Sequence, residues 1–155
     1  PPSPNLPNMK AVYLYPATCY FEATPVSLGR GTSLPFQVYG HPNMTGYDYC
    51  FTPKSVPGAK NPPQLNKLCH GVNLSNMSDE EIWKRGVDLS YVIDAYKNLN
   101  IGDHFFRPFF ELLVGTDYVR KMIIEGKSAE EIKSRWKGDV EKFKEQRKPY
   151  LLYQE

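Results

Sequence analysis

The hydrophobic pattern divides the chain into two halves of different character. From about residue 9 to residue 76, short apolar runs such as 11–15 and 36–39 alternate with Gly and Pro, which favours strands joined by ordered loops. Apolar residues then recur at helical spacing, which predicts one helix or a broken pair over 79–99 and further helices over 116–126 and 128–147. Strands followed by helices predict an α+β fold: an irregular, β-rich N-terminal half with long Pro-rich loops, with two to four helices packed on it.

Polar residues mark where the predicted helices begin. Ser78 with Glu81, and Ser128 with Glu131, have the spacing of a capping box, in which each side chain bonds the backbone N–H of the other residue. Thr116 is expected to cap the short helix between them. The first predicted helix contains a glycine at position 86, where an interruption is expected.

The last predicted helix carries a regular apolar stripe. Ile132, Trp136, Val140 and Phe143 follow one another at steps of four, four and three, so they share one face of the helix. We expect this face to pack against the core, and Pro149 to mark where the helix stops.

Two Pro-rich segments lie outside these elements. Residues 1–8, PPSPNLPN, are predicted to be an extended linker, so that residues 9–155 form a single domain. Residues 53–65, PKSVPGAKNPPQL, cannot pack a core and are predicted to form a long surface loop.

Length and charge exclude several classes of protein. A chain of 155 residues fits one ordinary domain, and no stretch approaches the about 20 apolar residues of a membrane span. The formal net charge of +2 gives no field that would attract nucleic acid or anionic lipid. The chain opens at Pro1 without a charged flank and an apolar stretch, so we expect no signal peptide in it and interpret it as an excised piece of a longer protein.

Cysteine and histidine spacing gives no metal centre. Cys19, Cys50 and Cys69 allow one disulfide and one thiol, or three thiols, and none belongs to a CxxC pair. The histidines, at positions 41, 70 and 104, are too scattered for a ligand set, and neutral, hydrogen-bonded roles are expected for them. We therefore predict neither a metal nor a cofactor.

The most distinctive segment is residues 15–37, YPATCYFEATPVSLGRGTSLPFQ. Gly29 and Gly31 flank Arg30, so the backbone can turn tightly and the guanidinium can form a bidentate interaction with a carboxylate or phosphate. Glu22 lies in an uncharged, partly aromatic run, where desolvation would raise the pKa of its carboxyl group and suit it to proton transfer. The alternatives are a turn with an exposed arginine and a structural carboxylate that binds loop amides or pairs with Arg30.

A second polar cluster precedes the aromatic run at residues 105–110. Asp103, His104 and Arg107 lie close together in the sequence. A polar helix end beside core aromatics explains them equally well.

Three stretches of the chain resemble a known family. The segments YPATCYFEATPVSLGRGTSLPFQVYGHP, CHGVNL and GTDYVRKMIIEGKSAEEIKSRWKGDVEKFKEQRKPYLLY are similar to the C-terminal half of the NamZ-like exo-β-N-acetylmuramidases, formerly a family of unknown function and now glycoside hydrolase family 171. The similarity runs from about residue 11 to residue 153. It implies an auxiliary domain whose bacterial family releases N-acetylmuramic acid from the non-reducing ends of peptidoglycan fragments, outside the cytoplasm. It also implies an N-terminal Rossmann-like partner domain, absent from this chain, with the active site in the cleft between the two.

The resemblance assigns roles residue by residue. The family's C-F-E-G-T stretch matches the segment with Glu22, the expected catalytic residue, and its S-x-G-R-G-T stretch matches the segment around Arg30. The substrate-binding residues that it implies are Thr24, Gly29, Arg30, Gly31 and Thr32. We expect Arg30 to hold the lactyl carboxylate of a muropeptide, and Glu22 to face the scissile bond or orient the acetamido group.

Some residues depart from the family pattern, and others carry a disulfide expectation. Ala23 stands where the family has Gly and Pro25 where it has Asn, so the loop backbone is less free than in the family. Cys19 and Cys69 both fall in family-like segments and are the expected pair outside the cytoplasm, which leaves Cys50 free.

Three functions remain open from the sequence. The chain can supply one wall of a glycosidase cleft, in which case it turns over little or nothing alone, since glycoside hydrolysis needs two groups placed across one bond. It can be a non-catalytic glycan-binding module. It can also be a structural domain that braces its partner, which predicts a large apolar patch without a polar pocket.

Overall fold

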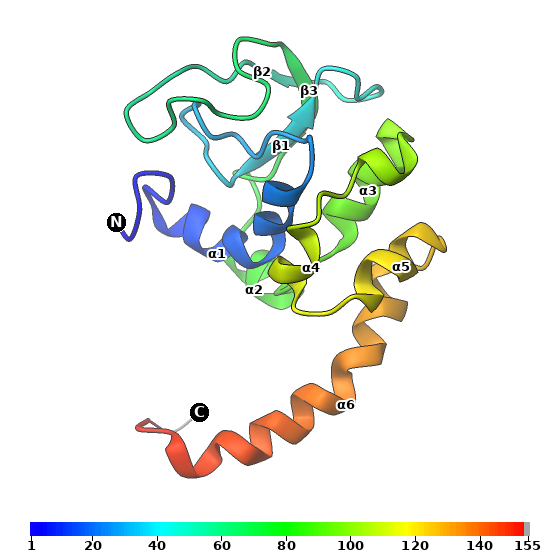
Figure 1. The fold of residues 1–155 in the computed structure, drawn as a ribbon. Coiled ribbons are helices and arrows are strands. Elements are labelled where there is room, and N and C mark those ends of the chain that lie inside the picture. Colours follow the sequence, from blue (N-terminus) through cyan, green and yellow to red (C-terminus); the bar gives the residue numbers. More distant parts are fainter. Residues whose placement is uncertain (154–155) are drawn as a thin grey trace.

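The structure, a computed structural model that describes residues 1–153, has the predicted α+β fold (Figure 1). Helices form most of it, and three short strands form a sheet at one end. The elements in chain order are α1 (Met9–Thr18), η1 (Cys19–Ala23), β1 (Val38–His41), β2 (Tyr49–Phe51), β3 (Cys69–Asn73), α2 (Asp79–Arg85), α3 (Ser90–Leu99), η2 (Gly102–His104), α4 (Phe110–Val114), α5 (Tyr118–Ile124), α6 (Ala129–Arg147) and η3 (Lys148–Tyr150), where η denotes a 3-10 helix.

The first element corrects a prediction. Residues 11–15 are helical, not a strand, and lie inside α1. The helix begins where the Asn8 side chain accepts a hydrogen bond of 2.9 Å from the Ala11 N–H. Ala11, Leu14 and Thr18 are buried at steps of three and four. A run of five apolar residues is too short to separate helix from strand, and the helical period is visible only over the whole of residues 9–18.

The sheet is antiparallel, with strand order β1-β3-β2. Val38 pairs with Asn73 in β1 and β3, and Tyr49 pairs with Gly71 in β2 and β3. The predicted strand over residues 36–39 is displaced, because Phe36 has a φ of 60° and its N–H bonds the Leu28 carbonyl at 2.8 Å. The N-terminal half is therefore irregular, as predicted, with less strand than its apolar runs indicate.

Aromatic packing joins the sheet to the helices. Phe21 of η1 is fully buried and stacks on Tyr39 of β1, with ring centroids 4.9 Å apart. The hydroxyl groups of Tyr39 and Tyr47 both donate to the Asp94 carboxylate of α3, at 2.8 and 2.7 Å. The core thus holds η1, the sheet and α3 in one fixed arrangement.

The predicted helix boundaries are confirmed with one exception. Gly86, at φ 58°, ends α2 and separates it from α3. Ser128 and Glu131 form a complete capping box at α6, whereas at α2 only the Ser78 side chain accepts, from the Glu81 N–H. Thr116 does not cap α5, since the helix begins one residue later than expected and the buried Thr116 hydroxyl has no partner within residues 1–153.

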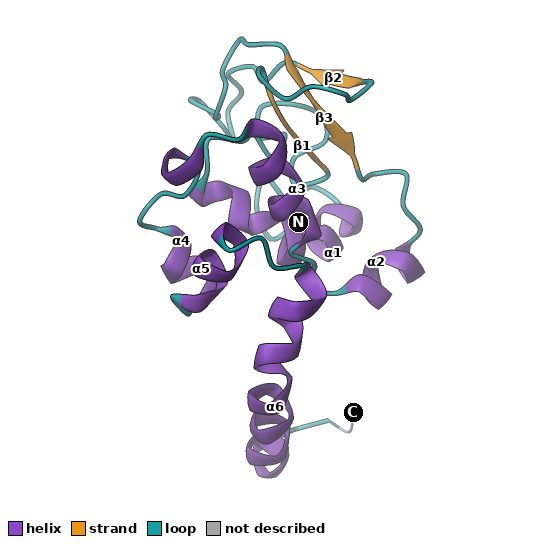
Figure 2. Ribbon diagram, turned by 90° about the vertical axis from the view of Figure 1, so that its right-hand side faces the viewer, coloured by secondary structure: helices purple, strands orange, loops and turns teal. Residues whose placement is uncertain are grey.

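Helix α6 leaves the body of the molecule. Ile132 is fully buried and Trp136 half-buried, but Val140 is 41% exposed and Phe143 60% exposed. The prediction that the whole stripe packs on the core is therefore wrong beyond Trp136. Figures 1 and 2 show the reason: the helix extends past the last element against which it could pack. Within residues 1–153, no helix combines the length and the apolar character that a membrane crossing requires.

The two Pro-rich segments meet each other and support residues 24–36. Loop 53–65 runs outside the regular elements, as predicted, and the Lys54 N–H bonds the Gly31 carbonyl at 2.9 Å. The Gln64 side chain donates to the Pro25 carbonyl at 2.8 Å. The Asn5 side chain donates to the Gly58 carbonyl at 2.9 Å, so residues 1–8 lie against this loop.

Replacing Gly31 by Ala is expected to destabilise the domain more than replacing Gly46 by Ala. Both glycines have φ near +80°, at 82° and 81°, so both variants carry the same backbone strain of about 1–2 kcal/mol. A Cβ at Gly31 would also overlap the Lys54 carbonyl oxygen, whereas one at Gly46 meets nothing within 4 Å. In urea, the free energy of unfolding of the Gly31 variant should be lower than that of the Gly46 variant by about 1–3 kcal/mol. Equal losses of stability in the two variants would contradict the close packing at Gly31.

Candidate functional site

Glu22 and Arg30, predicted from the sequence, line one shared pocket. The cavity has a volume of about 280 Å³. Its other lining residues come from the N-terminal segment, α1 and the turn before β1: Ser3, Asn5, Leu6, Tyr15 and Phe36. The pocket is open to solvent, so the two charged side chains form part of an accessible rim.

The short helix η1 determines the direction of Glu22. Phe21 is buried in the core, and the neighbouring Glu22 is half-buried and turned to the pocket. The helix ends at Ala23, and the N–H of the next residue, Thr24, bonds the Phe21 carbonyl at 3.0 Å. No described residue makes a hydrogen bond or ion pair with the Glu22 carboxylate, which is therefore available to a ligand.

The two glycines fix the position of Arg30. Gly29 and Gly31 have φ of 79° and 82°, a conformation that glycine adopts without strain. A Cβ on Gly29 would come within 2.6 Å of the Val38 side chain, so the loop lies directly on the sheet. The Nε atom of Arg30 is buried and has no hydrogen-bond partner within residues 1–153. No hydrogen bond or ion pair joins the Arg30 guanidinium to another residue of 1–153, so this cation is available to an anionic ligand.

The pocket perturbs its titratable groups. Burial raises the pKa of the Glu22 carboxyl group above its usual value, and the positive charge of Arg30 acts in the opposite direction. The pKa of the Tyr15 hydroxyl is raised by burial and by the charge of Glu22. The same two causes raise the pKa of the Cys19 thiol to about 11, so this thiol stays protonated at neutral pH. Burial in this pocket thus makes the Glu22 carboxyl group harder to ionise than an exposed glutamic acid.

An aromatic wall adjoins the two charges. The Tyr15 and Phe36 rings lie 5.1 Å apart at an angle of 45°. Phe36 is a bulky residue in the left-handed region, at φ 60°, and such strain persists only where the surrounding structure imposes it. The Thr18 hydroxyl lies 3.3 Å from the Phe36 carbonyl oxygen, to which it donates, and so helps to hold this turn.

The two threonines expected to bind substrate are engaged with the backbone. The buried Thr24 hydroxyl donates to the Phe21 carbonyl at 2.9 Å and accepts from the Val26 N–H at 3.1 Å. The Thr32 hydroxyl donates to the Gly29 carbonyl at 2.7 Å and accepts from the Leu34 N–H at 3.0 Å. Neither lines the pocket. Their role in this structure is to hold the loop that carries Arg30.

The cysteines are free, so the expected bridge between Cys19 and Cys69 is not formed. Cys19 lies in η1 beside Glu22, while Cys69 is buried in β3 in a separate cluster with Val38 and Phe51. Their occurrence in two family-like segments gives no information on distance in the fold.

The histidines are less scattered than the sequence predicts. His41 and His70 are paired residues of β1 and β3, and Cys50 of β2 pairs with His70 from the other side. The Cys50 sulfur lies 3.2 Å from Nδ1 of His70. Within residues 1–153, however, no three His, Cys, Asp or Glu side chains are arranged to hold a metal ion.

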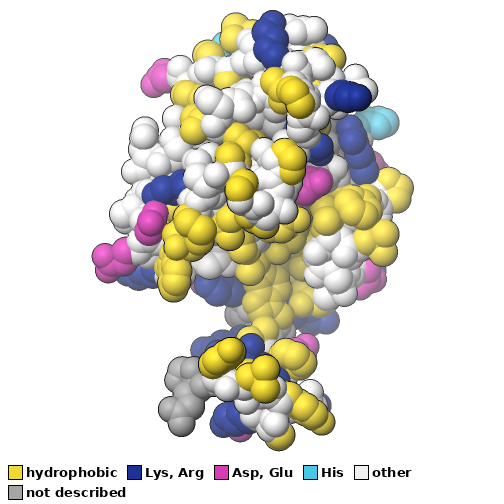
Figure 3. All heavy atoms as spheres, turned by 90° about the vertical axis from the view of Figure 1, so that its left-hand side faces the viewer, with side chains coloured by type: hydrophobic (Ala, Val, Ile, Leu, Met, Phe, Trp, Pro, Cys, Tyr) yellow, Lys and Arg dark blue, Asp and Glu magenta, His cyan; other side chains and the backbone are white. Residues whose placement is uncertain are grey.

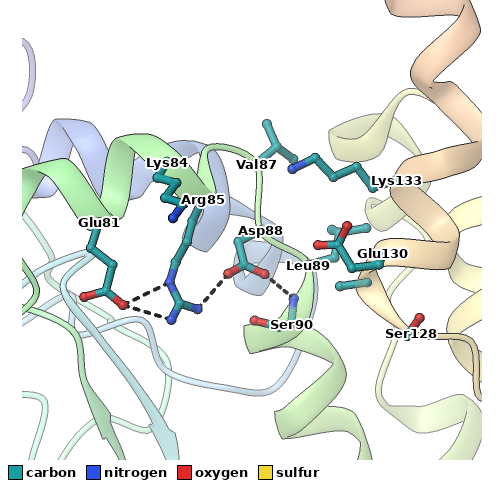
Figure 4. A pocket seen from close by; sticks show the side chains of 11 residues that line it. Glu81, Lys84, Arg85, Val87, Asp88, Leu89, Ser90, Ser128, Glu130 and Lys133 are labelled. Atoms are coloured by element: carbon teal, nitrogen blue, oxygen red, sulfur yellow. Dashed lines mark hydrogen bonds and ion pairs between the residues drawn. The ribbon is translucent and has the colours of Figure 1, made fainter.

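A larger cavity, of about 580 Å³, lies between the loop joining α2 and α3 and the start of α6 (Figure 4). Its Arg85 guanidinium bonds both the Glu81 and the Asp88 carboxylates, at 2.9 and 3.2 Å. The cluster of Asp103 and Arg107 lines another open hollow, in which Glu111 pairs with Arg120. These groups are already neutralised or exposed, so the pocket of Glu22 and Arg30 is the stronger candidate site.

The pocket residues that sequence reasoning missed come from the chain's start. Ser3, Asn5 and Leu6 belong to the segment predicted to be a linker. Leu6 packs against the core. The sequence signal for this contact was the pair Asn5-Leu6 between two prolines, because a flexible linker has no need of an apolar residue that packs on the core.

Comparison with known proteins gives a consistent family match. The model of the family "Exo-beta-N-acetylmuramidase NamZ, C-terminal" matches residues 13–153. The chain is 33% identical over 167 residues to the peptidoglycan beta-N-acetylmuramidase NamZ of Bacillus subtilis (strain 168), covering 98% of this chain and 40% of that protein. A crystal structure of a DUF1343 family protein from Bacteroides fragilis NCTC 9343 is 82% identical, with a TM-score of 0.99 over 100% of this chain and 44% of that one.

A second DUF1343 family protein from Bacteroides fragilis NCTC 9343 shares the fold. It is 19% identical, with a TM-score of 0.69, and the match covers 99% of this chain and 45% of that one. The chain therefore spans less than half the length of the relatives that it matches.

Replacing Glu22 by Gln is expected to stabilise the domain at pH 7 and not at pH 3. Because the folded-state pKa of Glu22 is raised, the stability linked to its protonation is present at low pH and is lost as the pH rises through that pKa. Gln cannot ionise, so it avoids this loss. The measurement is the free energy of unfolding in urea at both pH values.

Replacing Glu131 by Gln is the matched control, for which the expected change in the free energy of unfolding at pH 7 has the opposite sign. Its pKa is lowered by hydrogen bonds from Ser128, so its stabilising charge is present at neutral pH and is lost as the pH falls. The Glu131 variant should lose stability at pH 7. If the Glu22 variant also lost stability at pH 7, pairing with Arg30 would outweigh burial and the unpaired carboxyl group would be refuted.

Proposed function

The chain belongs to the C-terminal domain family of the exo-β-N-acetylmuramidase NamZ, and we propose that it supplies one wall of the active site of a peptidoglycan glycosidase. The pocket of Glu22 and Arg30 is the part of that active site carried by this chain. The activity is that of the full-length protein, which releases N-acetylmuramic acid from the non-reducing ends of peptidoglycan fragments outside the cytoplasm.

One observation carries the proposal. An acid with a raised pKa and an arginine with a buried, unpartnered nitrogen line the same pocket, and no ion pair within 4 Å joins them in the described chain. A structural pair would have closed into a salt bridge. Two ionisable groups that are not paired with each other, beside an aromatic wall, are typical of a site for a polar ligand.

The chemistry of N-acetylmuramic acid fits these groups. Its lactyl carboxylate is the anion that the Arg30 guanidinium binds. The rings of Tyr15 and Phe36 provide an apolar surface for a sugar face, and Asn5 adds an amide to the rim. Arg30 thereby distinguishes muramic acid from glucosamine, which has no lactyl group.

Glu22 is the catalytic carboxyl group on this side of the bond. Burial raises its pKa, the direction that suits a group which transfers a proton to the leaving oxygen or donates a hydrogen bond that orients the acetamido group in a substrate-assisted reaction. Hydrolysis also requires a second group across the glycosidic bond. We assign that group to an N-terminal Rossmann-like domain of the full-length protein, so this chain alone should bind sugar without turning it over.

A non-catalytic glycan-binding module is the second candidate. Glu22 is the one acid that lines the pocket among residues 1–153, which by itself suffices for binding and not for a two-carboxyl mechanism. Activity of the full-length protein on a chromogenic N-acetylmuramide, with none from the isolated chain, supports the glycosidase wall. If both are inactive and the chain still binds the sugar, the module remains.

Replacing Arg30 by Ala in the full-length protein is expected to raise KM for a muramic substrate by about 10- to 100-fold, because a charge-assisted hydrogen bond contributes about 1.5–3 kcal/mol. KM for the matching glucosamine substrate should change little. Steady-state kinetics on the two chromogenic substrates measure both values. Equal increases in KM would refute the assignment of Arg30 to the lactyl carboxylate.

Replacing Glu22 by Gln in the full-length protein is expected to lower kcat by about 10²- to 10⁴-fold, the usual contribution of a positioned acid or base. KM should be retained, because Gln preserves the size and the hydrogen-bonding oxygen of the side chain. Glu81→Gln, outside the pocket, is the matched control and should keep normal kcat. An unchanged kcat in the Glu22 variant would exclude a catalytic role.

A further inference from the structure

The C-terminal arm, residues 136–153, presents an apolar surface that the body of the molecule does not cover. Phe143 is 60% exposed, and the aromatic rings of Tyr150 and Tyr153 are more than 80% exposed. Leu152 is 90% exposed. Figure 3 shows hydrophobic side chains gathered along the stalk and at its lower end. Scattered apolar residues are normal on a surface, but a continuous set of this kind marks an interaction site.

The size of this surface matches an interface between domains. A fully buried aromatic side chain covers about 150–250 Å², so the three exposed rings of Phe143, Tyr150 and Tyr153 offer roughly 350–550 Å². Interfaces between domains of one chain bury about 600–1,500 Å² counted over both partners, so half of that is needed from each side. The leucines at positions 151 and 152 add to the area available on the arm.

The position of the N-terminus indicates which partner lies there. Figure 1 shows residues 1–8 and the end of α6 on the same side of the molecule, with open space between them. Figure 3 views the molecule from that side and shows the apolar band of the arm facing the viewer.

The length of the relatives points to the same partner. This chain covers 44% of the Bacteroides fragilis protein, to which it is 82% identical, so more than half of that polypeptide lies outside it. The family match extends to residue 153, so the arm belongs to the domain and is not an unrelated tail. A domain joined directly to Pro1 has a high effective concentration at this surface, which a separate protein lacks.

From these observations we propose that the arm packs along its apolar face against the domain that precedes Pro1 in the full-length protein. The arm and residues 1–8 then hold that domain at two separate points. This inference goes beyond the proposed function, since it concerns a surface distinct from the pocket and requires no hydrolysis.

Hydrogen–deuterium exchange of the full-length protein tests the arm directly. We expect peptides covering residues 137–153 to be protected, and Phe143→Glu to reduce that protection by about tenfold or more, since a buried charge opposes packing. Exchange should also increase in a patch of the preceding domain. Gly138→Glu is the matched control: it adds the same charge on the opposite face of α6, where a side chain meets nothing within 4 Å, and should not reduce protection, because replacing a helical glycine favours the helix.

Three results would overturn the proposal. The first would be an arm that exchanges as fast as a solvent-exposed helix in the full-length protein. The second would be a Phe143→Glu variant whose protection falls no more than that of Gly138→Glu. The third would be protection that falls on dilution together with a dimer in sedimentation, which would assign the surface to a second copy of the protein. Peptides from α3 and β3 report in every sample whether the domain remains folded. Because the readout is exchange and not turnover, its failure is distinguishable from a failure of the glycosidase proposal.

Discussion

The burial of Phe21 is the interaction on which the rest of the site depends. This side chain is fully buried and stacks on Tyr39, whose hydroxyl group in turn bonds the Asp94 carboxylate of α3. Because η1 is a single short 3-10 helix, the side chain of Glu22 points away from the core once the neighbouring Phe21 is buried in it. A carboxyl group on a flexible loop would find a cation or water. Here the backbone has already been positioned by a large apolar contact, so the acid stays partly buried and unpaired.

The arginine is held by a different means. Gly29 and Gly31 bring the loop against the sheet and against Lys54, and loop 53–65 supplies backbone and side-chain bonds from the outside. The hydroxyl groups of Thr24 and Thr32 satisfy backbone groups within the same loop. A Pro-rich segment that cannot form a core thus acts as a brace. Rigid support of this kind is what a binding site requires if its charged group is to remain without a partner until a ligand arrives.

The sequence was sufficient for the fold class and for placing Glu22 and Arg30 in one candidate pocket, but not for the other residues that line this pocket. Capping residues and the helical stripe located α6 and the break at Gly86, because these signals are local. Residues 11–15 were misjudged because the period of α1 needs a longer window and because its capping residue, Asn8, lies in a Pro-rich segment. The contribution of Ser3, Asn5 and Leu6 to the pocket depends on a contact with Gly58, more than fifty residues away, for which no local pattern exists.

The same contrast explains why the arm could not be interpreted correctly from its stripe alone. Steps of four, four and three show that Ile132, Trp136, Val140 and Phe143 share a face, but they do not show what that face meets. The body of the domain ends near Trp136, and the later residues of the stripe, Val140 and Phe143, are exposed to solvent. Since an exposed apolar face lowers solubility and gives no stability to the isolated domain, its extension argues for a partner that covers it. Under the two proposals made above, the same domain, joined at Pro1, would complete the pocket and cover the arm.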